Sequence, residues 1–387
     1  RRRGYEAELA AWKTVEVPLA AAMNGIKGSQ NTILKRRGRK SPIDKSLDQS
    51  KIDQETLDAM LGAMKDSFPM FRRYFKAKAK RLGKEALPWW DLFAPMGKSS
   101  RTFAYLEAQT FVLENFAKFS EDLAEFADRA FKHNWIDVAP RPGKRAGAFC
   151  MGIPGVKESR VMLNFEDNLD WVFTLAHELG HGFHNHCAYE EGRTILQSRN
   201  PMTLAETASI MCETIVTDAA IKMAADEQEE LAILETALMG DSQVVVDIYS
   251  RYLFETEVFE RRQKAELAPE EFNEIMEWAQ GETYGDGLDL AYRQKYMWTW
   301  KPHYYYAGLA FYNYPYAFGL LFGTGLYAIY QQRGADFVPE YKALLASTGM
   351  GQAADLAAGF GLDLRSKSFW EGSLAVIGQR VERYVNL

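Results

Sequence analysis

The sequence predicts a mainly α-helical fold with one small β element, and three observations lead to this prediction. Apolar residues recur every three or four positions through most of the chain, which is the period of an amphipathic helix. Only residues 146–165 combine two short apolar runs with a Gly- and Pro-containing turn, as a β-hairpin does. Directly after them, residues 169–183 carry an apolar stripe together with the pattern His177-Glu178-x-x-His181.

Taken in order, the chain divides into three expected regions. These are a helical lobe over about residues 1–140, the hairpin and the helices next to it over about 141–225, and a second helical lobe over about 226–387. In the first lobe we expect one long helix over 1–40 ending in a basic turn, helices at 53–66, 68–83 and 100–134, and a break at 87–91. The chain of 387 residues, 47% of them hydrophobic, is large enough to bury such a core.

The hairpin is expected to pair residues 146–151 with residues 160–165. Two interpretations of it stay open. Its free edge could hydrogen-bond an extended peptide, since an exposed strand edge accepts another strand. Alternatively, the hairpin only closes the core.

The helix that follows the hairpin has the features of a metal site. His177 and His181 lie one turn apart on one face, so that both imidazoles can reach one cation. Glu178 is rotated by about 100° from His177, which suits a base beside a metal rather than a ligand. Gly180 and Gly182 each cost about 1 kcal/mol of helix stability relative to alanine. We therefore expect a second element to approach this helix closely.

A third ligand has to come from elsewhere, because Cys187 occupies the position where a longer zinc motif would have its third histidine. Asn200-Pro201 predicts a helix start, with Asn200 as N-cap and Pro201 as the first helical residue. Glu206 follows and is a candidate ligand. It also completes a capping-box pattern with Thr203, and this alternative stays open.

Two further residues are candidates for supporting roles. Glu213, seven residues after Glu206, suits a carboxylate that accepts the free N–H of a ligand histidine. His184 shares the face of His177 and His181, and it either supports the ligands or is simply packed.

These motifs resemble the thimet oligopeptidase family of zinc metallopeptidases, and most closely its oligoendopeptidase F branch. The resemblance rests on three stretches of the sequence, namely His177-Glu-Leu-Gly-His181-Gly-Phe-His184 with Pro201-Met-Thr-Leu-Ala-Glu206, Gly143-Lys-Arg-Ala-Gly-Ala-Phe-Cys150, and Phe311-Tyr-Asn-Tyr-Pro-Tyr-Ala-Phe-Gly319. It implies a helical zincin-type catalytic domain in which His177, His181 and Glu206 bind one zinc ion per chain and Glu178 is the general base. It also favours the peptide-binding interpretation of the hairpin.

The aromatic segment from Tyr292 to Phe318 is the last candidate region. Aromatic residues at this density usually form core, but peptide hydrolysis needs a donor for the developing oxyanion. Tyr312, Tyr316 and His303 are the candidates, and family resemblance implies a His and tyrosines in this role.

Composition excludes several other classes of function. The net charge of −6 gives no reason to expect nucleic-acid binding, and we interpret the basic run at residues 35–40 as a solvated turn. Three cysteines without a C-x-x-C pattern favour a reducing compartment, so we expect a cytoplasmic protein. The longest apolar run, residues 316–330, is too short and too rich in glycine to span a membrane. The N-terminal helical region of the family is expected to be absent.

The sequence therefore predicts a zinc-dependent endopeptidase that hydrolyses short, unstructured oligopeptides, with no nucleic-acid or membrane partner. Two alternatives remain: a zinc exopeptidase of similar helical fold, and an inactive peptide-binding module that lacks its N-terminal region. Oligomeric state cannot be read from the residues.

Overall fold

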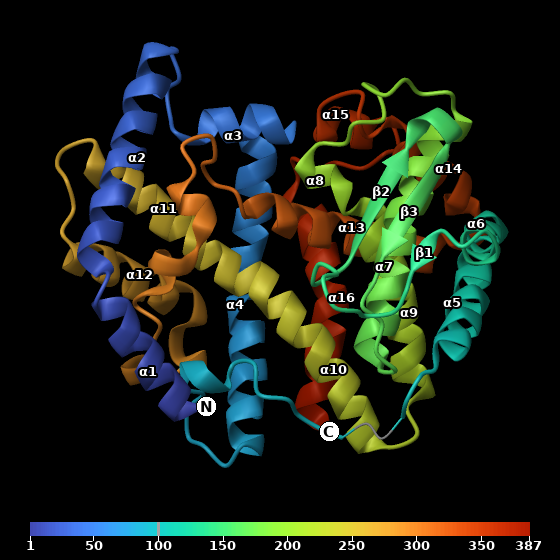
Figure 1. Ribbon diagram of the computed structural model, residues 1–387, viewed down its shortest axis with the longest axis horizontal. Helices are drawn as coiled ribbons and strands as arrows, with labels where there is room; N and C mark the ends of the chain where they lie inside the picture. The colour runs from blue at the N-terminus through green and yellow to red at the C-terminus, as the bar shows by residue number, and fades with distance from the viewer. Residues whose placement is uncertain (99–100) are drawn as a thin grey trace. The chain divides into compact units, whose positions relative to one another are not determined.

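The structure is a computed structural model that describes residues 1–98 and 101–387. Helices make up most of these residues and one small sheet accompanies them, which confirms the predicted fold class (Figure 1). The chain forms two compact units. The first comprises Arg1–Met96, Leu238–Ala317 and Gly378–Leu387, and the second comprises Gly97–Ala237 and Phe318–Ile377. The division into three consecutive regions, over about residues 1–140, 141–225 and 226–387, remains a prediction from the sequence.

The first unit is built from helices around an aromatic core. Its helices are α1 (Arg2–Lys13), α2 (Glu16–Arg36), α3 (Ile43–Ser50), α4 (Gln54–Arg81), α11 (Ile248–Arg262) and α12 (Pro269–Tyr284). Phe254, Phe272 and Trp298 are fully buried at the centre of this core. The indole N–H of Trp298 donates to Asn273 Oδ1 over 2.9 Å, which satisfies its buried polar group.

Two helix boundaries in this unit were predicted wrongly, both near a proline. The expected single helix over 1–40 is divided into α1 and α2 at Thr14 and Val15. Pro18 explains the break, because proline lacks the N–H of a helix interior but fits the first turn of a new helix. The reverse error concerns the helices expected at 53–66 and 68–83, which form the single helix α4 with Pro69 inside it.

The second unit is organised around the helix pair α7 (Leu169–Glu190) and α9 (Thr207–Met223). The other helices of this unit are α5 (Tyr105–Phe119), α6 (Glu121–Lys132), α8 (Met202–Ala205), α14 (Val338–Ser347) and α15 (Ala353–Ala358). The helix expected over 100–134 is interrupted at Ser120, whose extended backbone ends α5 and begins α6. Three helices, α10 (Glu227–Ser242), α13 (Tyr314–Arg333) and α16 (Lys367–Asn386), contribute residues to both units.

A three-stranded sheet in the order β1-β3-β2 lies beside α7. The predicted hairpin is confirmed as β2 (Phe149–Ile153) and β3 (Glu158–Met162), which pair antiparallel with Phe149 opposite Met162. The first strand starts later than expected, since Gly147 has a positive φ of 82°. The two-residue strand β1 (Ile136–Asp137) pairs parallel with β3 and was not predicted. Within this sheet β2 is an edge strand.

No helix in the described part of the chain has the length and apolar character needed to cross a membrane. Cys150, Cys187 and Cys212 are all free thiols.

Candidate metal centre

Two histidines of α7, His177 and His181, point at a carboxylate that follows them in the chain. Asn168 begins α7 by accepting a hydrogen bond from the N–H of Trp171, as an N-cap does. This start places the rings of His177 and His181 one turn apart, with their centroids 4.9 Å from each other. Glu206 Oε2 lies 3.2 Å from Nε2 of His177 and 3.3 Å from Nε2 of His181. The structure therefore brings the three predicted ligands together.

Glu206 reaches this position from the junction between α8 and α9. Pro201, not Asn200, is the N-cap of α8, and Met202 is the first helical residue, so the predicted helix start is wrong by one position. Thr203 lies inside α8 rather than before it, which contradicts the capping-box alternative. The Glu206 carboxylate instead accepts a hydrogen bond from Ser209 Oγ over 2.8 Å while it faces the two imidazoles.

Glu213 lies on the other side of His177, as the spacing predicted. Its Oε2 is 2.8 Å from Nδ1 of His177. Both ring nitrogens of His177 thus face carboxylate oxygens, although a neutral imidazole has only one N–H. Burial disfavours the imidazolium, but Glu206 and Glu213 outweigh this effect and raise the pKa of His177 to about 10. Burial likewise opposes ionisation of Glu206, yet the contacts with His177 and His181 lower its pKa.

This donor set fits a zinc ion. Zinc binds His nitrogen and carboxylate oxygen at about 2.0–2.2 Å, and a tetrahedral arrangement then separates two ligand atoms by about 3.3–3.6 Å. The observed separations from Glu206 Oε2 of 3.2 and 3.3 Å lie at the short end of that range. With a cation on Nε2, His177 is neutral and its Nδ1–H donates to Glu213, which is the usual outer contact of a metal-bound histidine.

Glu178, between the two histidines in sequence, is the candidate base. Its side chain is buried at 6% exposure, and among the described residues its Oε2 has no hydrogen-bond partner. Burial raises the pKa of Glu178, against the lowering effect of His177 and His181. A carboxylate that is poorly solvated and only partly hydrogen-bonded is a stronger proton acceptor than one in water.

Glycines set the separation between the helices that carry these residues. A Cβ added at Gly180 would lie 2.6 Å from the carbonyl oxygen of Ala208 on α9, which confirms the expected close approach. At Gly182 the neighbour is the ring of Phe126, 2.8 Å away. A Cβ at Gly319 on α13 would lie 2.7 Å from Cβ of Glu206, so that this glycine leaves room for the candidate ligand.

His184 is packed behind the cluster rather than part of it. The side chain is buried, and its Nε2 lies 2.7 Å from Thr348 Oγ1 and 3.1 Å from Asn200 Nδ2. Thr348 also donates to Asn200 Oδ1 over 2.7 Å. Burial lowers the pKa of His184 to about 4. This network joins α7 to the start of the segment that carries Glu206. The sequence indicated Asn200 only as an N-cap, and it gave no sign of Thr348.

The aromatic candidates form a cluster of their own in the first unit. The hydroxyls of Tyr312 and Tyr316 lie 2.8 Å apart, and the ring of His303 lies 5.4 Å from that of Tyr312. Burial lowers the pKa of His303 to about 3, so the ring is neutral at pH 7. Because this cluster belongs to the first unit and the metal cluster to the second, the oxyanion role of these residues stays a prediction.

A buried ion pair holds the segment that leads into this cluster. Phe311 has a positive φ of 52°, which is rare for a residue with a side chain. Its N–H donates to Glu255 Oε2 over 2.9 Å, and Glu255 Oε1 accepts from Lys27 over 2.6 Å. Both charged side chains are almost completely buried. Neither was identified from the sequence, because they come from helices 228 residues apart.

Comparisons with known proteins agree with the motifs. A model of Peptidase family M3 matches residues 1–376. Group B oligopeptidase PepB of Streptococcus agalactiae is 26% identical over 388 residues, which cover 100% of this chain and 64% of the relative. Oligopeptidase PepF of Bacillus subtilis is 23% identical over 389 residues, which cover 100% of this chain and 57% of the relative.

Solved structures show the same fold. A crystal structure of a protein from Chlamydophila abortus superposes with a TM-score of 0.88 at 21% identity, covering 99% of this chain and 64% of the other. Oligoendopeptidase-F from Enterococcus faecium superposes with a TM-score of 0.75 at 19% identity, covering 99% and 63%. The chain thus spans less than two thirds of the length of these relatives.

Proposed function

Because the chain belongs to peptidase family M3, we propose that it is a zinc metalloendopeptidase that hydrolyses short, unstructured oligopeptides. One observation carries the proposal: His177, His181 and Glu206 converge within ligand distance of one another, with the buried carboxylate of Glu178 on the same helix turn. The names of the relatives, which include oligopeptidases and oligoendopeptidases, support the substrate class.

His177, His181 and Glu206 would hold the zinc ion, and Glu213 would fix the orientation of His177 through its Nδ1–H. Zinc with three protein ligands acts as a Lewis acid on a carbonyl and lowers the pKa of water toward 7. Glu178 takes the proton of the attacking water on its unpartnered oxygen and later delivers it to the leaving amine. The raised pKa of Glu178 supports both transfers at neutral pH.

Two further parts of the chain are assigned by the proposal. The open edge of β2 binds the extended substrate backbone, because an edge strand presents unpaired N–H and C=O groups. The hydroxyl of Tyr312 or Tyr316, or the ring of His303, donates to the oxyanion. Their mutual hydrogen bond and ring contact support a shared role.

The variant Glu178→Gln tests the proposal. It keeps the shape of the side chain but cannot accept a proton, so we expect zinc content to be unchanged and turnover of a quenched fluorogenic peptide to fall by at least about a thousandfold. Zinc content is measured on the purified protein, and a chelator control identifies metal-dependent turnover. A variant with normal turnover would remove Glu178 from the role of base.

Blocked substrates distinguish the endopeptidase from the two alternatives. A peptide acetylated at its N-terminus and amidated at its C-terminus is cleaved by an endopeptidase but not by an enzyme that needs a free end. We expect cleavage within the blocked peptide, identified by mass spectrometry. Peptide binding without cleavage by the zinc-loaded protein would instead favour the inactive binding module.

A further inference from the structure

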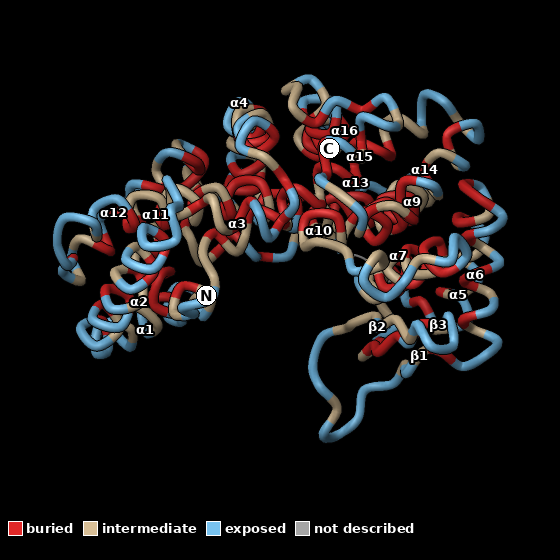
Figure 2. The backbone as a smooth tube through the Cα atoms, turned by 90° about the horizontal axis from the view of Figure 1, so that it is seen from above, coloured by how far each residue is buried: buried red, intermediate tan, exposed pale blue. Residues whose placement is uncertain are grey.

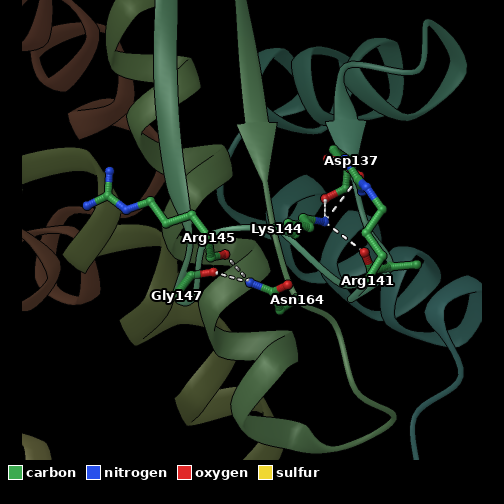
Figure 3. A network of polar contacts seen from close by, with 7 residues as sticks. Asp137, Arg141, Lys144, Arg145, Gly147 and Asn164 are labelled. Carbon is green, nitrogen blue, oxygen red and sulfur yellow. Dashed lines mark hydrogen bonds and ion pairs between the residues drawn. The ribbon is translucent and has the colours of Figure 1, made fainter.

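The loop between β1 and β2, residues 138–148, is exposed but internally ordered by polar contacts. It projects beyond the strands in Figure 2. At its start Asp137 forms a two-point ion pair with Arg141, with N–O distances of 2.7 and 2.8 Å. Lys144 lies 3.1 Å from the same carboxylate, and its Nζ also donates to the carbonyl oxygens of Asp137 and Ala139 (Figure 3). Two of the three cations in the loop are thereby engaged.

The third cation is Arg145, whose backbone is fixed while its side chain is not. The Nδ2 atom of Asn164 donates to the carbonyl oxygens of Arg145 and Gly147, each over 2.9 Å. Within the described ranges the guanidinium of Arg145 has no carboxylate or carbonyl partner, and the residue is exposed. Figure 3 shows the side chain extending away from β3, on the side of β2 that carries no other strand.

The direction of β2 relates Arg145 to the metal-binding turn of α7. A Cβ added at Gly152 would lie 2.5 Å from the hydroxyl of Tyr189, near the C-terminal end of α7. Two residues earlier, the sulfur of Cys150 lies 3.8 Å from the Cβ position of Gly182, one residue past His181. β2 and α7 therefore run in the same direction. The start of β2 and the loop before it lie toward the part of α7 that carries His177 and His181.

From this arrangement we propose that Arg145 is a specificity-determining residue that binds a carboxylate of the substrate peptide. The inference rests on the proposed function, because it needs a peptide on the open edge of β2. A guanidinium forms two parallel hydrogen bonds with a carboxylate, and an Arg with no internal partner is free to make them. The carboxylate is either the C-terminus of the peptide or an acidic side chain, and the preferred substrates are oligopeptides that carry one of them near the scissile bond.

Three versions of one peptide distinguish these sources. The first is a neutral peptide with a free C-terminus, and the second is the same peptide amidated. The third is the amidated peptide with two Glu residues, one before and one after the scissile bond. We expect the wild type to show a KM roughly fivefold to tenfold lower for the peptides with a carboxylate than for the neutral amidated one. Loss of preference for only one carboxylate peptide in the variants identifies the source.

Variants of Arg145 test the assignment against a matched control. Arg145→Gln raises the KM for the carboxylate peptides to that of the amidated neutral peptide, and Arg145→Glu reverses the preference in favour of peptides with lysine. Lys157→Gln is the control, since Lys157 is an exposed cation beyond the opposite end of β2. An equal effect of Arg145→Gln and Lys157→Gln, or an unchanged preference in Arg145→Gln, would overturn the inference.

A binding measurement keeps this test separate from the proposed function. Fluorescence anisotropy of the labelled peptides with the zinc-loaded Glu178→Gln protein gives Kd without turnover, and we expect the same dependence on the carboxylate and on Arg145. Binding that follows Arg145 in a protein whose wild type cleaves no peptide would reject the proposed function and retain this inference. Cleavage by the wild type with binding indifferent to Arg145 would do the opposite.

Discussion

Gly180→Ala is the most direct test of how the fold sets the metal site. The added methyl group would lie 2.6 Å from the carbonyl oxygen of Ala208 and 2.7 Å from Cα of Ser209, both backbone atoms of α9. Non-bonded carbon contacts are favourable at about 3.5–4.0 Å, so α9 has to move away from α7 by about 1 Å. Overpacking of this kind costs about 1–3 kcal/mol, against about 1 kcal/mol gained in helix propensity. We expect the free energy of unfolding of the metal-free protein to fall by about 0–2 kcal/mol.

The larger effect should be on zinc affinity. Ala208 is two residues beyond Glu206, and α9 also carries Glu213, so the displacement moves one ligand and the partner of another. Disturbing such outer contacts typically costs 10–100-fold in metal affinity, roughly. The dissociation constant is measured by competition with a chelator of known affinity, and unfolding by a urea titration.

The control for this test is Gly25→Ala. Gly25 is exposed on α2, and a Cβ there meets nothing within 4 Å, so only the propensity gain applies. We expect this variant to be slightly more stable with unchanged zinc affinity. If Gly180→Ala behaves in the same way as Gly25→Ala, the close approach of α7 and α9 does not determine the ligand geometry.

Three other predictions follow from the same contacts. Glu213→Gln should weaken zinc binding about 10–100-fold, since an amide does not fix the Nδ1–H of His177 as a carboxylate does; an unchanged affinity would contradict that role. His184 has a folded pKa lowered to about 4, so it is neutral in the native state and protonates first in the unfolded state. As the pH falls from about 6.5 to 4, the metal-free protein should lose up to about 1.4 kcal/mol of stability per pH unit from this group, and His184→Gln should flatten the profile; parallel profiles would refute the assignment. Tyr312→Phe should lower kcat about 10²–10³-fold at unchanged zinc affinity if its hydroxyl is the oxyanion donor, whereas Tyr305→Phe, in the same segment, should not.

The metal cluster could be predicted because its geometry is local. Helical periodicity alone puts His177 and His181 on one face of α7, and Glu206 lies close enough in sequence to come from the next helix. Gly180 predicted the close approach of α9, because a residue that is unfavourable in a helix indicates a close neighbour. The hairpin followed from its turn residues, although Gly147 moved the start of β2.

What could not be predicted depends on contacts between distant segments. Thr348 meets His184 across 164 residues, and Lys27 meets Glu255 across 228, and neither pair has a spacing that a pattern can detect. The proline errors have a related cause. Pro18 lies in the first turn of α2, just after the break at Thr14 and Val15, whereas Pro69 lies inside α4, so the presence of a proline does not by itself show where a helix ends.

The residues assigned to zinc and the candidate oxyanion donors belong to different units of the chain. Every group assigned to zinc lies on α7, α9 or the residue that joins α8 to α9, and all of them belong to the second unit. The candidate oxyanion donors belong to the first unit, where the Lys27–Glu255 pair fixes the backbone at Phe311. Metal affinity and turnover should therefore respond to different substitutions: changes at the α7–α9 contact alter both, whereas changes to the tyrosines alter turnover alone. A Tyr312→Phe variant that loses zinc would contradict this separation, because Tyr312 precedes α13, the helix whose Gly319 packs against Glu206.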